Sequence, residues 1–216
     1  MSDLFAALDA AQPSQETIAE AAVLLRGFAL AGQETLLADL RQIVTAAPFR
    51  HMVTPGGHRM SVAMTSCGDA GWVTDRRGYR YAAKDPDSGA QWPAMPASFR
   101  TLAQQAAAAA GFAEVRPDSC LINRYLPGAK MALHQDRDEK DLAAPIVSVS
   151  LGLPAVFLFG GLKRSDRTRR YRLAHGDVVV WGGPSRLCFH GVAPLAEGDH
   201  PLLGGQRINL TFRKTV

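Results

Sequence analysis

The sequence Arg207-Ile208-Asn209-Leu210-Thr211-Phe212-Arg213 alternates strictly between polar and apolar residues. Because successive side chains of a β-strand point to opposite faces, this alternation predicts a strand with Ile208, Leu210 and Phe212 on one face. The other face then carries two arginines, an asparagine and a threonine. An exposed amphipathic strand with solvated arginines has the same pattern. Against that alternative, guanidinium groups bind carboxylates through paired hydrogen bonds, so this face suits a small dicarboxylate.

Short strand candidates continue through the C-terminal half of the chain, separated at close spacing by Gly, Pro and Asp. This pattern is typical of a β-sandwich or a jelly roll, and we expect an α+β, mostly β fold with a double-stranded β-helix (jelly-roll) core over residues 118–213. Apolar residues at helical spacing predict a buttressing helix at 33–46, and an Ala-rich run predicts a second from Ser98 to Ala110. The strand candidates are 22–28, Cys120–Tyr125, Ile146–Leu151, Ala155–Phe159, Arg170–Leu173, Val178–Trp181, Leu187–His190 and Arg207–Arg213.

The N-terminal part of the chain differs in composition and in the regularity of its pattern. Residues 1–20 are polar and Ala-rich and are expected to form a loose arm. Residues 50–96 are rich in Gly, Pro, Asp and aromatic residues, with a strand-like piece at Met60–Thr65. A stretch this long and irregular is typical of a lid or a binding surface. With no repeat and no flexible linker, we expect a single domain over 1–216, with the lid across one mouth of the β core.

The composition is that of a mildly basic globular chain. Of 216 residues, 47% are hydrophobic and 20% are charged, and the net charge is +4. This excludes a disordered chain and is compatible with nucleic acid without requiring it. Cys67, Cys120 and Cys188 form neither a disulfide framework nor a zinc-binding pair, which favours a reducing cytoplasm. With no signal sequence and no membrane-length apolar run, we expect a cytoplasmic protein without membrane contact.

His134 and Asp136 are two residues apart, so a strand here would place both side chains on one face. An imidazole and a carboxylate form two-thirds of the 2-His-1-carboxylate set that binds non-haem Fe(II) with open positions. His190 is the candidate for the second histidine, whereas His175 directly precedes a Gly-Asp turn and is interpreted as a turn residue. An ordinary hydrogen-bonded pair and a core histidine would explain the same residues.

Asn123 and Tyr125 share one face of the strand that precedes His134. Together with the polar face of 207–213 they would supply amide, phenol and guanidinium groups beside an Fe(II) site. This combination suggests a bound 2-oxo acid.

The order Asn-x-Tyr, His-x-Asp, distal His and Arg-x-Asn-x-Thr-x-Arg resembles the AlkB family of Fe(II)/2-oxoglutarate dioxygenases. The resemblance spans residues 48–213 and includes Thr54-Pro55-Gly56-Gly57 and His175–Gly183. It implies that the catalytic iron ligands are His134, Asp136 and His190. It also implies that 2-oxoglutarate is anchored by Arg207 and Arg213, assisted by Asn123, Tyr125 and Asn209. Which arginine takes which carboxylate stays open.

The resemblance also implies a set of substrate contacts. Trp72, with His134, would stack on the target base, and Met64 would line the pocket. Tyr79, Asp138 and Arg164 would contact the substrate. Trp72 and Tyr79 are also explained as core aromatics, and Asp138 as part of an acidic loop. His58 departs from the family pattern, in which the bacterial relative has a phenol, so one lid contact stays open.

The implied reaction is oxidative demethylation of alkylated bases such as 1-methyladenine and 3-methylcytosine, a direct reversal of alkylation damage. It uses Fe(II), 2-oxoglutarate and O₂ and releases formaldehyde, succinate and CO₂. The expected partner of a monomeric enzyme is alkylated single- or double-stranded DNA, with RNA as a further candidate, and the basic loop 163–170 would bind phosphates. The alternatives are a 2-oxoglutarate-dependent hydroxylase of a small molecule or protein, and a non-catalytic jelly-roll binding module.

Overall fold

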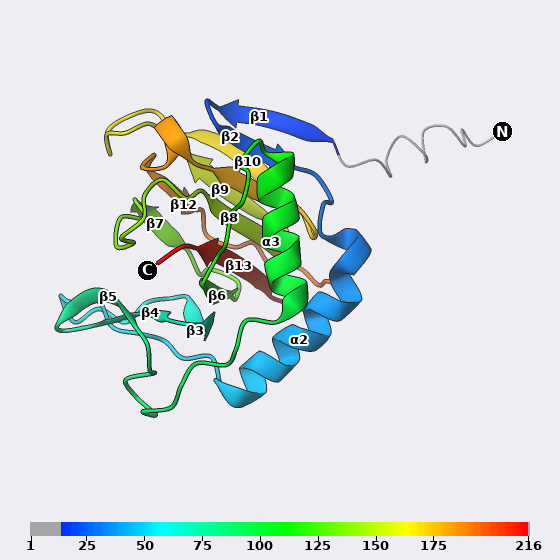
Figure 1. The fold of residues 1–216 in the computed structure, drawn as a ribbon. Coiled ribbons are helices and arrows are strands. Elements are labelled where there is room, and N and C mark those ends of the chain that lie inside the picture. The colour runs from blue at the N-terminus through cyan, green and yellow to red at the C-terminus, as the bar shows by residue number, and fades with distance from the viewer. Residues whose placement is uncertain (1–13, 216) are drawn as a thin grey trace.

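The computed structural model describes residues 14–215 as two antiparallel sheets, a separate hairpin and two α-helices (Figure 1). The helices are α2 (Gln33–Ala46) and α3 (Ala97–Ala109), with 3-10 turns at Leu30–Gly32 and Gly183–Ser185. The strands are β1 (Gln15–Ala19), β2 (Ala22–Leu25), β3 (Ala63–Gly68), β4 (Gly71–Asp75), β5 (Gly78–Ala82), β6 (Ser119–Tyr125), β7 (Met131–His134), β8 (Ile146–Gly152), β9 (Ala155–Phe159), β10 (Arg169–Leu173), β11 (Val178–Trp181), β12 (His190–Val192) and β13 (Arg207–Arg213).

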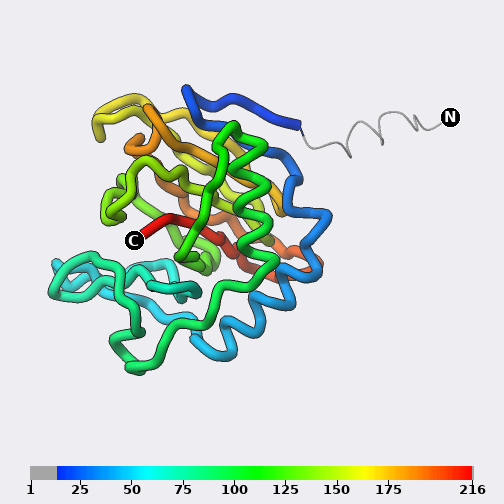
Figure 2. Tube along the Cα trace, viewed as in Figure 1, coloured from blue at the N-terminus to red at the C-terminus, as the bar shows by residue number. Residues whose placement is uncertain are grey.

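Two sheets form the β core. The larger has the order β1-β2-β11-β8-β13-β6-β3, and the smaller has the order β10-β9-β12-β7. Non-consecutive strands lie next to each other in both sheets, as in a jelly roll. In the chain trace of Figure 2, α2 and α3 lie next to each other along one side of the β core. One apolar cluster contains residues of both sheets, among them Leu24, Phe157 and Trp181. The predicted mostly β, jelly-roll fold is therefore confirmed.

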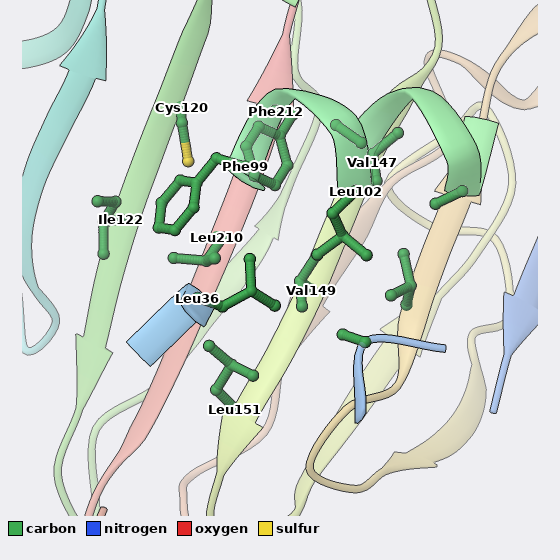
Figure 3. Packing of buried hydrophobic residues seen from close by; sticks show 14 of the residues in the cluster. Leu36, Phe99, Leu102, Cys120, Ile122, Val147, Val149, Leu151, Leu210 and Phe212 are labelled. Carbon is green, nitrogen blue, oxygen red and sulfur yellow. The ribbon is translucent and has the colours of Figure 1, made fainter. Parts of the chain in front are cut away.

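β13 is an interior strand of the larger sheet, hydrogen-bonded to β6 on one side and β8 on the other. Its apolar residues Ile208, Leu210 and Phe212 belong to the cluster that the helices cover (Figure 3). Phe212 meets Phe99 of α3 edge to face, with ring centroids 5.8 Å apart. The predicted alternation is confirmed.

The polar face of β13 is buried as well. Arg207, Asn209, Thr211 and Arg213 are each at most 6% exposed. The alternative of an exposed amphipathic strand with solvated arginines is therefore wrong. Buried arginines are rare unless they are paired, so the two arginines of this face require partners.

Several element boundaries differ from the prediction. Residues 15–19 of the expected loose arm form β1, because this polar edge strand pairs with β2 and buries Ile18; residues 1–13 lie outside the described part of the chain. The strand expected at 22–28 ends at Leu25, before a turn in which Gly27 has φ +62°. The strand expected at Leu187–His190 begins only at His190. The 3-10 turn at Gly183–Ser185 and the irregular residues after it occupy the chain before that point.

The segment expected to be a lid, 50–96, contains two kinds of structure. β3 belongs to the larger sheet, where it pairs with β6, and it lies three residues beyond the expected start at Met60. β4 and β5 form a separate two-stranded hairpin, drawn at the lower left of Figure 1. Gly78, with φ +113°, closes its turn, and Arg80 binds Asp75 at 2.7 Å.

The three cysteines are free, buried thiols, as the scattered spacing predicted. Within residues 14–215, none of the helices has the length and apolar character that crossing a membrane requires.

Leu210→Ala should lower the free energy of unfolding by about 2–5 kcal/mol, because it leaves a cavity under the helices. Urea denaturation measures this change. Leu202→Ala is the matched control: Leu202 is 50% exposed, so its truncation should change stability by no more than about 0.5 kcal/mol. An equally small effect at Leu210 would contradict the assignment of this face to the core.

Candidate metal centre and cosubstrate pocket

A pocket enclosing about 450 Å³ of empty space, part of it open to solvent, is built from residues of both sheets. β6, β8 and β13 of the larger sheet contribute one wall, and β7, β9 and β12 of the smaller sheet contribute the other. The lining residues include all the predicted metal ligands and 2-oxoglutarate contacts: Asn123, Tyr125, His134, Asp136, His190, Arg207, Asn209 and Arg213.

Three candidate metal ligands converge at one point of this pocket. His134 ends β7 and is paired with His190, the first residue of β12. The Nε2 of His134 lies 3.5 Å from Asp136 Oδ1, and the Nε2 of His190 lies 3.7 Å from Asp136 Oδ2. The potential ligand atoms of all three residues lie within 4.8 Å of one another, as a shared metal ion requires.

Asp136 lies two residues beyond the end of β7, so the expectation that it shares a strand face with His134 is wrong. The triad forms nonetheless, because the chain leaving β7 turns Asp136 toward both imidazoles. Each histidine bonds through Nδ1 to a backbone carbonyl, His134 to Ala132 at 2.9 Å and His190 to Cys188 at 3.0 Å. These bonds fix the tautomer in which Nε2 is free to bind metal.

The protonation states also suit metal binding. Burial lowers the pKa of His190 to about 4, so the imidazole is neutral at neutral pH. Burial alone would raise the pKa of Asp136, but the Arg213 guanidinium together with His134 and His190 holds this pKa well below its usual range. Burial alone would lower the pKa of His134, but the neighbouring Asp136 carboxylate raises it. The site therefore offers an ionised carboxylate and a neutral imidazole.

Arg213 clamps the metal-binding carboxylate. Its Nη2 donates to Asp136 Oδ2 at 2.6 Å and its Nε donates to the same oxygen at 3.0 Å. The same Nε lies 3.2 Å from Glu139 Oε1. Arg186 completes the group, since it donates to Glu139 Oε2 at 3.1 Å and to the backbone carbonyl of Asp136 at 2.6 Å. These buried charges are therefore paired, as their burial requires.

The hairpin is tied to this charge group. The phenol of Tyr81 in β5 donates to Glu139 Oε1 at 2.6 Å. Burial raises the pKa of Tyr81 far above its ordinary value, so the phenol stays protonated as a donor. Tyr81, Glu139 and Arg186 are not among the site residues predicted from the sequence. The one available signal was Glu139 itself, an acidic residue three positions after a metal ligand.

The cosubstrate half of the pocket contains buried polar atoms without a partner among residues 14–215. Arg207 donates from Nη2 to Ser150 Oγ at 2.8 Å, and its guanidinium lies 5.0 Å from the centre of the Tyr125 ring. Its Nε and Nη1 have no hydrogen-bond partner, nor do Asn123 Oδ1 and Trp181 Nε1. Unpaired buried donors and acceptors are strongly unfavourable, so this cluster indicates a bound polar ligand.

A hydrogen-bonded chain organises the rest of this polar wall. Asn209 donates from Nδ2 to Ser148 Oγ at 2.8 Å. Asn209 Oδ1 accepts from Thr211 Oγ1 at 2.8 Å and from Asn123 Nδ2 at 3.4 Å. These contacts hold the side-chain amides of Asn123 and Asn209 in one orientation. Arg207 is the lining residue whose cationic group keeps unpaired donors.

Trp72, Tyr79 and Asp138, predicted to contact the substrate, lie together. The rings of Trp72 and Tyr79 are stacked with centroids 5.6 Å apart and planes 17° apart. The indole Nε1 of Trp72 donates to Asp138 Oδ2 at 2.9 Å. Tyr79 is 50% exposed, so it does not act as a core aromatic.

The other predicted contacts lie elsewhere. Met64 is fully buried in the cluster between the sheets and is not one of the residues lining the pocket. Arg164 lies on the β9–β10 loop with its guanidinium 5.9 Å from the centre of the Phe189 ring. His58 is exposed in the loop that follows Thr54. His175 lies in a turn, as predicted, and outside the triad. Its Nε2 is hydrogen-bonded to Gln33 Oε1 at 2.8 Å.

Comparisons with known proteins agree with this geometry. A family model described as the 2OG-Fe(II) oxygenase superfamily matches residues 21–213. The chain is 59% identical to the alpha-ketoglutarate-dependent dioxygenase AlkB of Escherichia coli (strain K12), over 99% of this chain and 98% of the relative. The chain belongs to the AlkB family of Fe(II)/2-oxoglutarate dioxygenases.

Two further relatives support the same family. The AlkB protein of Salmonella typhimurium is 60% identical over 100% of this chain and 99% of its own length. A solved structure of OsALKBH1 superposes with a TM-score of 0.82 at 30% identity, covering 93% of this chain and 100% of that chain. The fold, the enzyme class and the cofactors expected from the family resemblance are thereby confirmed.

The residues present fit both cofactors of the family. Two imidazoles and one carboxylate are the donor set of an Fe(II) site with open positions. The unpaired Arg207 nitrogens and Asn123 oxygen provide the polar surface that a 2-oxo dicarboxylate needs. His134, Asp136 and His190 would hold Fe(II), and the wall of β6 and β13 would hold 2-oxoglutarate.

Asp136→Ala should abolish metal binding and all turnover, because it removes the one anionic ligand of the triad. Metal content after anaerobic reconstitution with Fe(II) and succinate formation measure both effects. His175→Ala is the control, since this histidine lies outside the triad, and it should retain metal. Full activity of Asp136→Ala would refute the metal centre.

Arg207→Ala should raise the 2-oxoglutarate concentration needed for half-maximal turnover by about thirtyfold or more, because losing one partner of a buried charge pair costs roughly 2–5 kcal/mol. Succinate formation at varied 2-oxoglutarate concentration measures this effect. Arg172→Ala, on the exposed side of β10, should leave the requirement unchanged. An unchanged requirement in Arg207→Ala would remove its anchoring role.

Proposed function

We propose that this enzyme removes methyl groups from ring nitrogens of alkylated nucleic-acid bases, of the 1-methyladenine and 3-methylcytosine type, in DNA and as a further substrate in RNA. The observation that carries this proposal is the stacked pair of Trp72 and Tyr79, joined to Asp138, only two residues after the metal ligand Asp136. Flat aromatic faces bind nucleobases by stacking. A carboxylate beside them favours a base that carries a positive charge.

When bound, Fe(II) and 2-oxoglutarate use O₂ to hydroxylate the methyl carbon, which then leaves as formaldehyde, while the cosubstrate becomes succinate and CO₂. The chain's own residues bind and orient the reactants and exclude water. Arg213 is already paired with Asp136 and Glu139, so it lies beside the metal ligands. Arg207, with two free nitrogens beside Tyr125, would therefore bind a carboxylate of 2-oxoglutarate.

The target base has to leave its stack to reach the triad. Methylation at these ring nitrogens disrupts base pairing and so lowers the cost of extruding the base from a duplex. The hairpin would receive this base between Trp72 and the metal ligands. The exposed cations of residues 163–170 would bind phosphates, so affinity should fall as salt concentration rises.

We further propose that the chain acts as one dioxygenase domain, as a monomer and in the cytoplasm. Support for a single domain comes from the site, since both sheets and the hairpin contribute to it. A 2-oxoglutarate-dependent hydroxylase of a small molecule or protein would use the same triad. It would have no use for the stacked pair of Trp72 and the half-exposed Tyr79, or for a row of exposed arginines, so this alternative is less well supported.

One assay tests the proposal. Formaldehyde and succinate are measured across alkylated and unmodified oligonucleotides, single- and double-stranded, DNA and RNA. Equal yields of both products from the methylated strands, and none above background from the unmodified ones, would support the proposal. Succinate formation without formaldehyde from any methylated strand would contradict it and favour another hydroxylase substrate.

Trp72→Ala should lower kcat/KM for methylated oligonucleotide by about tenfold or more, because stacking on an aromatic residue contributes roughly 1–3 kcal/mol per base. The slow 2-oxoglutarate turnover without nucleic acid should change little. Trp72→Phe keeps an aromatic ring but loses the bond to Asp138, so an intermediate loss is expected. Equal losses of both activities in Trp72→Ala would instead identify Trp72 as a structural residue.

A further inference from the structure

The loop between β9 and β10 exposes an apolar side chain beside a run of cations. Leu162 is 59% exposed, the largest fraction among the large exposed hydrophobic residues of the described chain. Lys163 and Arg164 follow it directly, and Arg167 is exposed in the same loop. A single exposed leucine is ordinary on a protein surface, so its meaning depends on how it is held and where it lies.

Two reciprocal hydrogen bonds fix the start of this loop. The Gly160 N–H donates to the Phe189 carbonyl at 2.8 Å, and the Phe189 N–H donates to the Gly161 carbonyl at 2.8 Å. Phe189 immediately precedes the metal ligand His190. The loop is therefore joined to the chain that carries the metal centre.

The residues that follow Leu162 are also fixed by hydrogen bonds. The Lys163 N–H donates to Asp166 Oδ2 at 3.0 Å, and the Asp166 N–H donates to the Lys163 carbonyl at 3.0 Å. A Cβ at Gly161 would collide with the Asp166 carboxylate, so any other residue there would displace the oxygen that accepts from the Lys163 N–H. Leu162 thus extends from a backbone that is fixed on both sides, and ordering it on binding requires little further loss of backbone entropy.

Leu162 lies within reach of a nucleic acid bound at the triad. Phe159 is the cross-strand partner of His190, and Leu162 follows it by three residues. Three residues span at most about 11 Å and paired strands add about 5 Å, so the two backbones lie within about 16 Å. Nucleotides of one strand are about 3.4 Å apart along the helix axis, so this reach covers only a few neighbours of the target base.

The loop and the β4–β5 hairpin extend on the same side of the molecule, with β7 between them in this view (Figure 1). The hairpin carries the half-exposed Tyr79, and the loop carries Leu162 with its cations. The guanidinium of Arg164 lies over the Phe189 ring. This contact keeps the positive charge of Arg164 near the base of the loop. Apolar and cationic groups together match the bases and phosphates of a nucleic acid.

We propose that Leu162 packs against a nucleobase adjacent to the flipped-out nucleotide, while Lys163 and Arg164 bind the neighbouring phosphates. The inference rests on the proposed function. Extruding a base from a duplex exposes the faces of its neighbours, and an apolar side chain placed against such a face offsets part of the lost stacking. A single strand has less stacking to lose, so Leu162 acts mainly on duplex substrates.

The test compares Leu162→Ala with wild type on the same 1-methyladenine strand, single and in a duplex. We expect kcat/KM to fall about fivefold to tenfold on the duplex and less than about twofold on the single strand. Leu162→Met, which keeps an apolar side chain, should restore the duplex activity. Leu202→Ala is the matched control: it truncates another half-exposed leucine, beside His200, whose ring stacks on His175.

A second readout does not depend on turnover. A 2-aminopurine placed next to the lesion in the duplex should brighten when wild type binds, because its stacking is disturbed, and should brighten less with Leu162→Ala. Equal losses on single and double strands, or an unchanged duplex rate, would overturn the role of Leu162. Absence of demethylation by wild type on every strand would instead refute the proposed function, and this inference with it.

Discussion

The ion pair between Arg213 and Asp136 is the interaction on which the site depends. Two guanidinium nitrogens hold one carboxylate oxygen at 2.6 and 3.0 Å in a buried setting, while both imidazoles face the same carboxylate. Without this cation, desolvation would favour the protonated acid, which is a poor metal ligand. The pair therefore supplies an ionised ligand in a fixed position before any metal binds.

The same pair explains why a strand with a polar face can be buried in the interior of a sheet. Arg213 at one end of β13 is satisfied by protein carboxylates, whereas Arg207 at the other end keeps free donors for a ligand. Glu139 extends the charge group to Tyr81 of the hairpin. Metal centre, cosubstrate wall and hairpin are thus parts of one hydrogen-bonded unit, in which a change at one part alters the others.

The sequence predicted what depends on local periodicity and on the order of motifs. The alternation over 207–213 predicted a strand with two distinct faces, and the family resemblance carried by the order of the motifs implied the triad of His134, Asp136 and His190. It could not predict Glu139, Arg186 and Tyr81 as a group, because residues so far apart in the chain meet only through tertiary folding. It misplaced Asp136 on a strand and missed β1, since an edge strand with a mostly polar sequence lacks an apolar period.

The most direct test of this account is anaerobic calorimetric titration of Arg213→Lys with Mn(II), an inert substitute for Fe(II). Lysine keeps the charge but is a single-point donor, so it cannot make the two-nitrogen contact with Asp136. If Arg213 positions this ligand, metal affinity should fall about tenfold or more while the urea midpoint shows the protein still folded. Wild-type metal affinity in a folded Arg213→Lys variant would contradict the central role of this pair.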